Sequence, residues 1–495
     1  MARLSVILAG LLWLRQAHAV VVPSSPPSGA ATVDPSLVSI SMEFFAFPGY
    51  TQLSGTNNCL NNLASLRGAQ PAIRIGGTTQ CVFSPYGKVP RYSCSLSHRD
   101  RATYDANLQS PVNYTVATPA DAPLSLTYGP SFFTLASQLQ GQVTVGLNRQ
   151  LNNEANSLAA GSRAKQSMGN LFAIELGNEP DLYASSSPIA SGTGWSESID
   201  ISNEAKWLTA LAPTLGNIFQ GAVYLSWNTQ QLVSSIGSAA LNTIKTISRH
   251  SYPQSACGGA STNLPNLMNH AGIVSYVNQY KAEATAAHNA GKKFFLGETN
   301  SATCGGGGIS PTFGAALWII DYVLQSALIG VDRLYFHHGT ISNCAYCWWG
   351  QNAVFSPYYG AVFVSEFLGT DGAKVAALSD TDTGMAIYAV YSAAGTPLRL
   401  LVLNTNYFDG TGTRSSTTVS FTGIATASGT KQAKRLTAPS ATSLADQGAA
   451  VTIGGGGRFG TNCARTGTEG TEAVAVSNNA FSVAVKASEA LIVNL

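Results

Sequence analysis

The segment LFAIELGNEPDLY, residues 171–183, is an apolar, β-prone run that stops abruptly at Gly-Asn-Glu-Pro. It predicts a strand over residues 172–176, because Pro180 has no N–H group and cannot continue a ladder of hydrogen bonds. Glu179 is therefore expected at the carboxyl end of a buried strand, directly after the side-chain amide of Asn178.

A second segment, KKFFLGETN at residues 292–300, has the same shape: a short apolar run, a glycine and then Glu298. A single glutamate at a strand end is more commonly solvated or paired with a basic neighbour. Two carboxylates that each end a strand are what glycoside hydrolysis requires, because one protonates the leaving oxygen and the other attacks, or activates water at, the anomeric carbon. Glu179 and Glu298 are therefore predicted to be catalytic.

Both segments belong to a series of strand-like runs separated by helix-capable stretches. Eight runs occur, at residues 37–47, 72–77, 143–148, 172–179, 223–228, 247–252, 294–298 and 334–338. Most gaps contain a helix-capable stretch, such as residues 204–218, 271–290 and 312–328. Buried strands that alternate with helices predict a parallel sheet, and eight such units close into a (β/α)8 barrel. The two glutamates then end the fourth and seventh strands, at the C-terminal face where such barrels carry their active sites.

From about residue 373 the pattern changes to short runs between Gly, Ser, Thr and Asn turns, with no helical period. The runs are residues 385–391, 398–404, 417–422, 449–453, 473–476, 481–485 and 490–495. They predict an antiparallel β-sandwich whose simplest role is to support the barrel. The expected fold class is α/β, a (β/α)8 TIM barrel at residues 35–370 with a C-terminal antiparallel β-sandwich domain at 371–495.

The opening MARLSVILAGLLWLRQAHA reads as a secretory signal peptide over residues 1–19, with a basic start, an apolar core and a small-x-small cleavage site. A membrane anchor is the alternative, but the apolar run is too short to span a bilayer. The protein is therefore expected to be secreted and extracellular, with no membrane partner.

Composition excludes several other classes of protein. Hydrophobic residues make up 45% and charged residues 11% of the chain, with 49 glycines, which is typical of a well-packed, turn-rich globular protein. Removing the signal segment takes two of the 27 basic residues and none of the 25 acidic ones, so the formal charge falls from +2 to zero. No basic surface for nucleic acid or another polyanion is indicated.

Eight cysteines in a secreted chain favour disulfides, although their pairing cannot be read from the sequence. Cys344 and Cys347 have the spacing of a metal or redox motif, but no second such pair and no suitable histidine pair accompany them. Structural disulfides are the favoured interpretation. Asn113 begins an N-glycosylation sequon, Asn-Tyr-Thr, so a glycoprotein is expected.

Three further polar residues are predicted at the barrel mouth. The amide of Asn178 is expected to bind a sugar hydroxyl, the alternative being a purely structural turn residue. Arg74 ends the second strand and is expected to orient a nucleophilic carboxylate and keep it ionised. A buried ion pair of Arg74 with Glu175, one layer deeper, is the alternative. Glu43 ends the first strand and could accept hydrogen bonds from sugar hydroxyls.

The sixth strand supplies His250 and Tyr252 within RHSYP, next to the seventh strand. The tyrosine hydroxyl is therefore expected to reach Glu298. A lone histidine is more often a satisfied core residue, which makes His250 the weaker of the two candidates. After Glu298, the backbone N–H groups of the glycine-rich loop at residues 303–308 could form an anion-binding concavity, or the loop could simply be flexible. Tyr346 and two tryptophans follow the eighth strand and offer aromatic faces to a sugar.

An Asn-Glu pair after strand four with a glutamate after strand seven is the pattern of the clan A retaining glycoside hydrolases. The phrases SMEFFAF, RIGGTTQ, ELGNEPDLY, RHSYP, FLGETNSA-TCGGGG, TFGAALW and NCAYCWWG resemble glycoside hydrolase family 79, and most of all its fungal secreted β-glucuronidases. The resemblance spans the whole mature chain. It implies that an N-terminal segment, residues 20–34, joins the C-terminal sandwich.

The resemblance also implies residue roles. Glu179 matches the acid/base and Glu298 the nucleophile, while Glu43, Asn178 and Tyr252 fall on sugar-contacting positions. Relatives in the family hold the uronate carboxylate with tyrosine hydroxyls and a backbone amide of the loop after the nucleophile. Tyr346 matches one such tyrosine and Gly305 lies in that loop. The loop itself offers Thr303-Cys304 and no tyrosine, which departs from the family's pattern.

The sequence thus predicts a retaining exo-β-glucuronidase that removes terminal β-linked glucuronic acid from glycans or glycosides, with 4-O-methyl-glucuronic acid as an open variant. No metal or organic cofactor is expected. An endo-acting, heparanase-like enzyme is one alternative, disfavoured because a sulfated chain would want a basic cleft. A catalytically silent sugar-binding barrel is another, disfavoured because both glutamates are present. In a retaining enzyme the two carboxyl groups should lie about 5–5.5 Å apart, and the like charge of Glu298 should raise the pKa of Glu179.

Overall fold

The computed structural model describes residues 18–77, 102–110, 123, 126–192, 194–341, 344, 346–379 and 384–495. Almost all of the predicted signal segment lies outside the described residues. The predicted glycosylation site Asn113 and two of the cysteines, Cys81 and Cys94, lie outside them as well.

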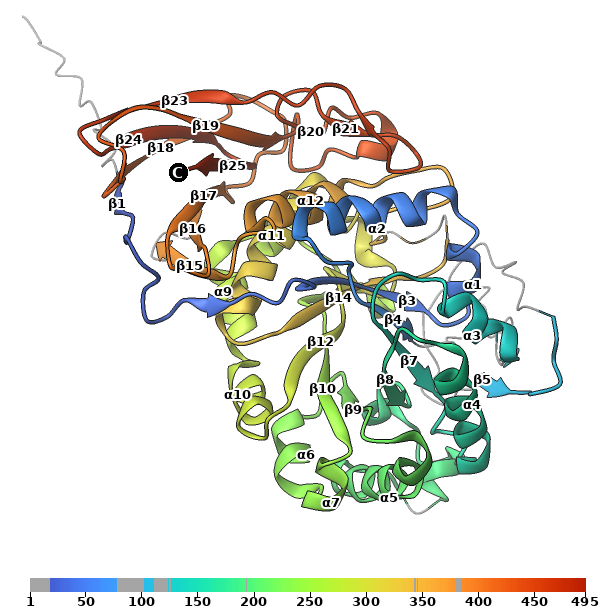
Figure 1. The fold of residues 1–495 in the computed structure, drawn as a ribbon. Helices are drawn as coiled ribbons and strands as arrows, with labels where there is room; N and C mark the ends of the chain where they lie inside the picture. The colour runs from blue at the N-terminus through green and yellow to red at the C-terminus, as the bar shows by residue number, and fades with distance from the viewer. Residues whose placement is uncertain are drawn as a thin grey trace, which may run out of the picture.

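A closed barrel of parallel strands forms the centre of the molecule (Figure 1). In order round the barrel the strands are β3 (Val38–Glu43), β4 (Ile73–Gly76), β7 (Val143–Leu147), β8 (Leu171–Leu176), β9 (Phe219–Tyr224), β10 (Ile244–Ser251), β12 (Lys293–Thr299) and β14 (Arg333–His338). Each strand pairs in parallel with both neighbours. The predicted eight-stranded barrel is confirmed; Glu179 follows its fourth strand, and Glu298 lies near the end of its seventh.

The prediction for the fifth strand, residues 223–228, is wrong. Strand β9 covers Phe219–Tyr224, so it begins and ends earlier in the chain than predicted. Its start was missed because Gln220 is polar. Inside the barrel, however, Gln220 is buried and its Nε2 donates to Glu175 Oε2 at 2.8 Å. A satisfied polar side chain therefore lets the strand begin before residue 223, the predicted start.

Helices surround the barrel between successive strands. They are α1 (Phe47–Tyr50), α2 (Ser54–Arg67), α3 (Pro130–Ala136), α4 (Glu154–Ser167), α5 (Glu197–Leu215), α6 (Thr229–Ser235), α7 (Ser238–Leu241), α8 (Leu264–Met268), α9 (His270–Asn278), α10 (Lys281–Asn289) and α11 (Phe313–Leu328), with α12 (Ser356–Leu368) after the last strand. The helix-capable stretch at 271–290 is thus two helices, α9 and α10, rather than one.

Helices α11 and α12 are buried almost throughout, because the C-terminal domain covers them (Figure 1). The N–H groups of Phe313 and Gly314 donate to the carbonyls of Ser443 and Ala441, at 2.9 and 2.7 Å. Gly360 on α12 lies so close to α11 that an added Cβ would fall 2.1 Å from the carbonyl oxygen of Ala316. Only glycine allows the two helices to approach this closely.

The C-terminal domain is a sandwich of two sheets, which confirms the predicted architecture. One sheet follows the order β2-β15-β16-β17-β25-β19-β20, with β23 paired to β19, and the other is β1-β18-β24. Their strands are β1 (His18–Val21), β2 (Ala31–Thr32), β15 (Lys374–Ser379), β16 (Met385–Tyr391), β17 (Pro397–Asn404), β18 (Ser416–Thr422), β19 (Ser428–Thr437), β20 (Thr452–Ile453), β23 (Glu472–Ser477), β24 (Phe481–Lys486) and β25 (Glu489–Asn494). At the start of the described chain, β1 runs parallel to β18, and β2 pairs antiparallel with β15.

Two sandwich strands, β15 and β19, were absent from the sequence prediction. Strand β19 reads SGTKQAKRLT and carries only two residues that are fully buried, Ala433 and Leu436. Its polar side chains hide the alternation that marks a half-buried strand. It nevertheless pairs with β20, β23 and β25, so tertiary pairing decides its conformation.

Three disulfides link the described cysteines: Cys59–Cys463, Cys257–Cys304 and Cys344–Cys347. The predicted disulfides are therefore present, and Cys344-Ala-Tyr-Cys347 is a disulfide rather than a metal motif. Cys59–Cys463 ties α2 of the barrel to the C-terminal domain. Within the described ranges, none of the helices has the length and apolar character needed to cross a membrane.

Candidate active site

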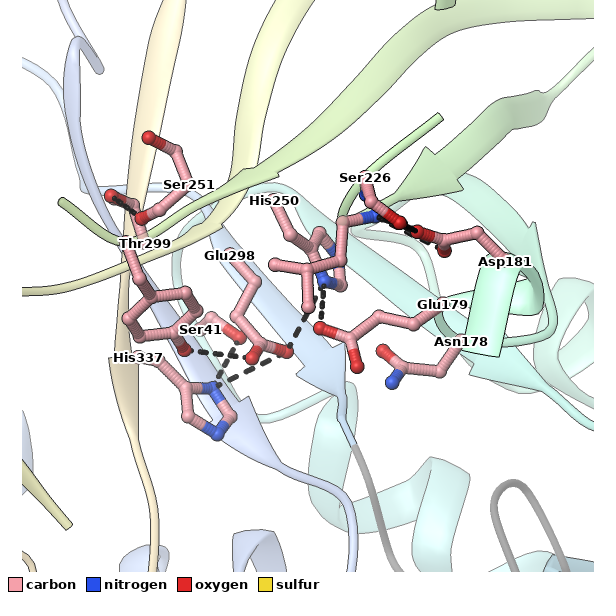
Figure 2. Close-up of polar contacts among 12 residues, drawn as sticks. Ser41, Asn178, Glu179, Asp181, Ser226, His250, Ser251, Glu298, Thr299 and His337 are labelled. Carbon is pink, nitrogen blue, oxygen red and sulfur yellow. Dashed lines mark hydrogen bonds and ion pairs between the residues drawn. The ribbon is translucent and has the colours of Figure 1, made fainter. Parts of the chain in front are cut away.

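The strand ends bring most of the predicted site residues to one end of the barrel, and Figure 2 shows Asn178, Glu179, His250, Glu298 and His337 converging there. All five residues are buried, the most exposed of them at 5%. Such a group of polar residues is stable away from water only when each member is hydrogen-bonded or paired.

Glu298 ends β12 and is held at both carboxylate oxygens. Its Oε2 accepts a bond from Arg74 Nη1 at 2.6 Å, and its Oε1 accepts the hydroxyl of Tyr252 at 2.7 Å. The predicted contact between Tyr252 and Glu298 is therefore present. Burial favours the protonated form, but the charges of His337, His250 and Arg74 and the Tyr252 hydrogen bond outweigh it and hold the pKa of Glu298 well below its usual range.

Glu179 follows β8 in a left-handed backbone conformation, with φ of 47°. Its N–H donates to the carbonyl of Val223 at 3.1 Å, which fixes the backbone against β9. Its Oε1 lies 3.0 Å from Nδ1 of His250, so the imidazole and the carboxyl group share a hydrogen bond. His250, the weaker sequence candidate, thus contacts Glu179 directly.

The two glutamates lie close together. One carboxylate oxygen of each, together with a ring nitrogen of His250, falls within a mutual distance of 4.8 Å. This is short of the roughly 6.5–9.5 Å that inverting glycosidases need to accommodate a water molecule. The same three atoms are spaced so that they could also hold a metal ion, but the guanidinium of Arg74 already supplies a positive charge to Glu298.

Arg74 makes both of the contacts that the sequence left as alternatives. Its Nη1 binds Glu298, while its Nε donates to both oxygens of Glu175, at 3.1 and 3.0 Å. Its Nη2 also donates to Oδ1 of Asn178 at 2.7 Å. One buried guanidinium therefore orients a carboxylate at the mouth, a second carboxylate one layer deeper, and the amide of Asn178, whose oxygen is turned towards Arg74.

His337, at the end of β14, connects Glu43 with Glu298 and was not selected from the sequence. Its Nε2 lies 3.4 Å from Glu43 Oε2, its Nδ1 lies 3.8 Å from Glu298 Oε2, and Nδ1 is hydrogen-bonded to Ser41 Oγ at 3.0 Å. Burial lowers its pKa, but Glu298 and Glu43 outweigh burial, so that the pKa of His337 is raised. Burial raises the pKa of Glu43, against the opposing effect of His337. The His-His-Gly at the end of the eighth strand was the available signal.

The two residues proposed for carboxylate recognition lie on loops. Tyr346 has its ring 5.9 Å from that of His337, and after burial and Glu298 its electrostatic effect helps to raise the pKa of Tyr252. Gly305 is exposed on the loop after β12. Tyr346 therefore joins the group around Glu298, whereas Gly305 makes no direct contact with either glutamate among the described residues.

The glycine-rich loop is anchored rather than simply flexible. Its first residues form β13 (Ala302–Thr303), which pairs with β11 (Gln254–Ser255) of the loop that follows Tyr252. The disulfide Cys257–Cys304 joins the same two loops. From Cys304 to Gly308 every φ is positive, between 52° and 85°, a conformation that glycine adopts without strain.

The chain is similar to one protein-family model and to curated proteins that share a name. Residues 387–492 match the family model for the glycosyl hydrolase family 79 C-terminal beta domain. A β-glucuronidase of Aspergillus niger is 31% identical over 445 residues, covering 81% of this chain and 77% of the relative. A β-glucuronidase of Neurospora crassa is 31% identical over 397 residues, covering 70% and 64%.

Among solved structures, a 4-O-α-L-rhamnosyl-β-D-glucuronidase from Fusarium oxysporum, in complex with Rha-GlcA, is 43% identical and superposes with a TM-score of 0.88. It covers 96% of this chain and 100% of its own. An α-L-arabinofuranosidase from Thermotoga maritima, 11% identical with a TM-score of 0.56, shares the fold alone.

Proposed function

The chain belongs to glycoside hydrolase family 79, and from that membership we propose that it is a retaining exo-β-glucuronidase that removes terminal β-linked glucuronic acid. The observation that carries the proposal is the placement of an ionised Glu298, bound by Arg74 and Tyr252, within 4.8 Å of Glu179. The names of its relatives support glucuronic acid as the sugar.

In the first step Glu298 acts as the nucleophile. Its carboxylate oxygen bonds to the anomeric carbon while the bond from that carbon to the aglycone oxygen breaks. The electron pair goes to the aglycone oxygen, which takes a proton from Glu179. Arg74 and Tyr252 keep Glu298 ionised and aimed, so the group enters the step as a carboxylate.

In the second step Glu179 acts as the base. It takes a proton from water, whose oxygen bonds to the anomeric carbon as the bond to Glu298 breaks and its electrons return to the carboxylate. Two inversions give net retention of the β configuration. His250, hydrogen-bonded to Glu179 at 3.0 Å, is suited to stabilise both protonation states of that carboxyl group in turn.

Glucuronic acid differs from glucose at C6, where a carboxylate replaces CH2OH, so selectivity depends on donors that face that corner. We assign the role to the hydroxyl of Tyr346 and to backbone N–H groups of the loop that contains Gly305, because the hydroxyl of Tyr252 is already donated to Glu298. Asn178 and Glu43 are assigned to sugar hydroxyls. Lys292 and Lys293 lie at the start of β12, at the opposite end of that strand from Glu298, and are not suited to the task.

A second candidate substrate is a glucuronide that carries rhamnose on O4. It is favoured by one observation: the Fusarium enzyme named for that activity is 43% identical to this chain, against 31% for the relatives named β-glucuronidases. The chemistry at the anomeric carbon would be the same, and only the room beyond O4 would differ. The same consideration keeps 4-O-methyl-glucuronic acid open.

Secretion and the domain limits are part of the proposal. A signal segment at residues 1–19 would direct the chain out of the cell. Residues 35–370 would form the catalytic barrel and residues 371–495 the sandwich, with 20–34 contributing to the sandwich. The last two residues of β1, Val20 and Val21, pair with β18, and β2 pairs with β15, which supports the assignment of residues 20–34 to the sandwich.

A panel of aryl β-glycosides tests the proposal. The glucuronide, its 4-O-methyl and 4-O-rhamnosyl derivatives, the glucoside and the galactoside should be compared, with NMR of the first-formed anomer. Release of the β anomer from a glucuronide supports the assignment. Release of the α anomer would contradict retention. Turnover of none of the aryl glycosides would contradict exo action on a terminal glucuronide.

A further inference from the structure

We propose that Glu204, a buried residue of helix α5 outside the sugar site, positions Glu179 by holding the backbone turn of β9 on which Glu179 rests. The inference depends on the acid/base role proposed for Glu179. It makes Glu204 a positioning residue, since it acts through the backbone and does not touch the substrate.

The turn in β9 has an unusual backbone. Ala222 and Val223 are consecutive, buried, and both left-handed, with φ of 72° and 60°. This conformation is uncommon for any residue other than glycine, and for a β-branched valine it is a marked outlier. Backbone of this kind persists only where surrounding contacts fix it, and it concentrates at functional sites.

This turn is directly connected to Glu179. The carbonyl of Val223 accepts the N–H of Glu179 at 3.1 Å. Two residues after Glu179, Asp181 accepts the N–H of Leu225, which lies two residues after Val223, at 3.1 Å. Asp181 also accepts the hydroxyl of Ser226 (Figure 2). The segment that carries Glu179 is therefore hydrogen-bonded to the end of β9, and a shift in residues 222–226 would carry the catalytic carboxyl group with it.

Glu204 supplies the contact on the other side of the turn. Its Oε1 accepts the N–H of Ala222 at 3.1 Å, and the residue is only 2% exposed. That bond satisfies a donor that left-handed backbone removes from the regular ladder. Glu204, the Ala222–Val223 turn and Glu179 thus form one continuous chain of contacts.

The surroundings of Glu204 disfavour a charged carboxylate. Its Oε2 is buried and has no hydrogen-bond partner among the described residues. Burial raises the pKa of Glu204 to about 7, against the charge of Arg149, which is itself paired with Asp200. An apolar side chain of similar size, such as leucine, would not carry the desolvation cost of Oε2. What glutamate adds is the acceptor for Ala222.

The test compares two variants that differ in that acceptor. Glu204→Gln keeps an oxygen that can accept from Ala222, whereas Glu204→Leu keeps the volume and removes the acceptor. Each is assayed on a matched pair of aryl glucuronides, one with an activated and one with a poor leaving group. Glu179→Ala serves as the reference, and Glu489→Ala as the control. Glu489 is a sandwich glutamate, 4% exposed, that likewise accepts a backbone N–H, from Lys486, at 3.1 Å.

Glu204→Leu should lower kcat on the poor leaving group by about 100-fold, since displacement of a catalytic group by about 1 Å has that effect. It should leave KM and kcat on the activated substrate nearly unchanged. Glu204→Gln should keep the wild-type ratio of kcat on the activated substrate to kcat on the poor one. Equal loss on both substrates, an unchanged ratio in Glu204→Leu, or a ratio in Glu204→Gln as poor as in Glu204→Leu would overturn the proposal.

Two further outcomes are decisive. A Glu204→Leu protein that does not fold would assign Glu204 to folding rather than to Glu179, which also overturns the inference. If Glu489→Ala changed the ratio of the two substrates as Glu204→Leu does, the effect would be general destabilisation. A Glu179→Ala reference with no dependence on the leaving group would instead reject the acid/base role of Glu179, and so separates failure of the proposed function from failure of the role of Glu204.

Discussion

Nη1 of Arg74 lies 2.6 Å from Oε2 of Glu298, a buried ion pair that joins the second strand of the barrel to the seventh. The pair sets the charge state of the site. With the guanidinium in place, the Glu298 carboxyl group stays ionised in a buried environment that would otherwise protonate it.

Arg74→Lys should lower kcat by about 100-fold or more, because one ammonium cannot reproduce a guanidinium bound to two carboxylates and an amide. The pKa of Glu298 should rise, so the acid limb of the pH–kcat/KM profile should move to higher pH. The measurement is that profile for an activated aryl glucuronide, with thermal unfolding to check the fold. An acid limb at its original position would show that Arg74 does not control the ionisation of Glu298.

Glu298→Ala should abolish turnover of every glucuronide, because no covalent intermediate can form. Glu179→Ala should reduce turnover of substrates with poor leaving groups far more than turnover of activated aryl glucuronides, because activated leaving groups need little protonation. Added azide should rescue Glu179→Ala on activated substrates, because the anion needs no general base. The opposite pattern in the two variants would reverse the assigned roles.

Tyr346→Phe should narrow the preference for glucuronide over glucoside by about 10–100-fold, equivalent to one lost hydrogen bond to a charged group. The loss should fall on the glucuronide, because the glucoside has no carboxylate to lose contact with. Comparison of kcat/KM for the two aryl glycosides measures it. Full selectivity in Tyr346→Phe would remove Tyr346 from carboxylate recognition.

The double variant Cys257→Ser/Cys304→Ser should also narrow the preference for glucuronide over glucoside. The disulfide joins the loop after Tyr252 to the loop that contains Gly305, whose backbone N–H groups are assigned to the carboxylate. The matched control is Cys59→Ser/Cys463→Ser, which removes a bridge between the barrel and the sandwich. The control should lower stability by about 2–5 kcal/mol and leave selectivity intact. Equal effects of both double variants on selectivity would indicate general loosening.

His337 should make folding stability depend on pH. Its pKa is raised by Glu298 and Glu43, which outweigh burial, so its stabilising contribution is complete below its unfolded pKa of about 6.5 and is lost as pH rises through the higher folded value. The difference in Tm between the wild type and His337→Asn should therefore be largest near pH 5 and shrink at alkaline pH. A difference independent of pH would mean that the imidazole is not charged in the folded protein.

Much of the fold follows from local signals. Seven of the barrel strands were predicted close to their observed positions, because buried parallel strands are apolar runs. Strand β8 ends at Leu176, directly before Gly177, whose φ is 83°. The fifth strand was displaced because the sequence does not reveal that Gln220 is satisfied inside the barrel by Glu175. Strand β19 was missed because its pairing partners, not its own side chains, select its conformation.

The sequence by itself determined the barrel, the sandwich and the two strand-end glutamates, since periodicity and chain termination act over a few neighbouring residues. Only the tertiary structure decided that Arg74 binds Glu298 and Glu175 together, that His337 joins Glu43 to Glu298, and which cysteines pair. Many of these contacts join residues far apart in the sequence, up to the 404 positions between Cys59 and Cys463. Others select among several partners that end strands at the same face. Their distances depend on closure of the barrel, and that closure is a property of all eight strands at once.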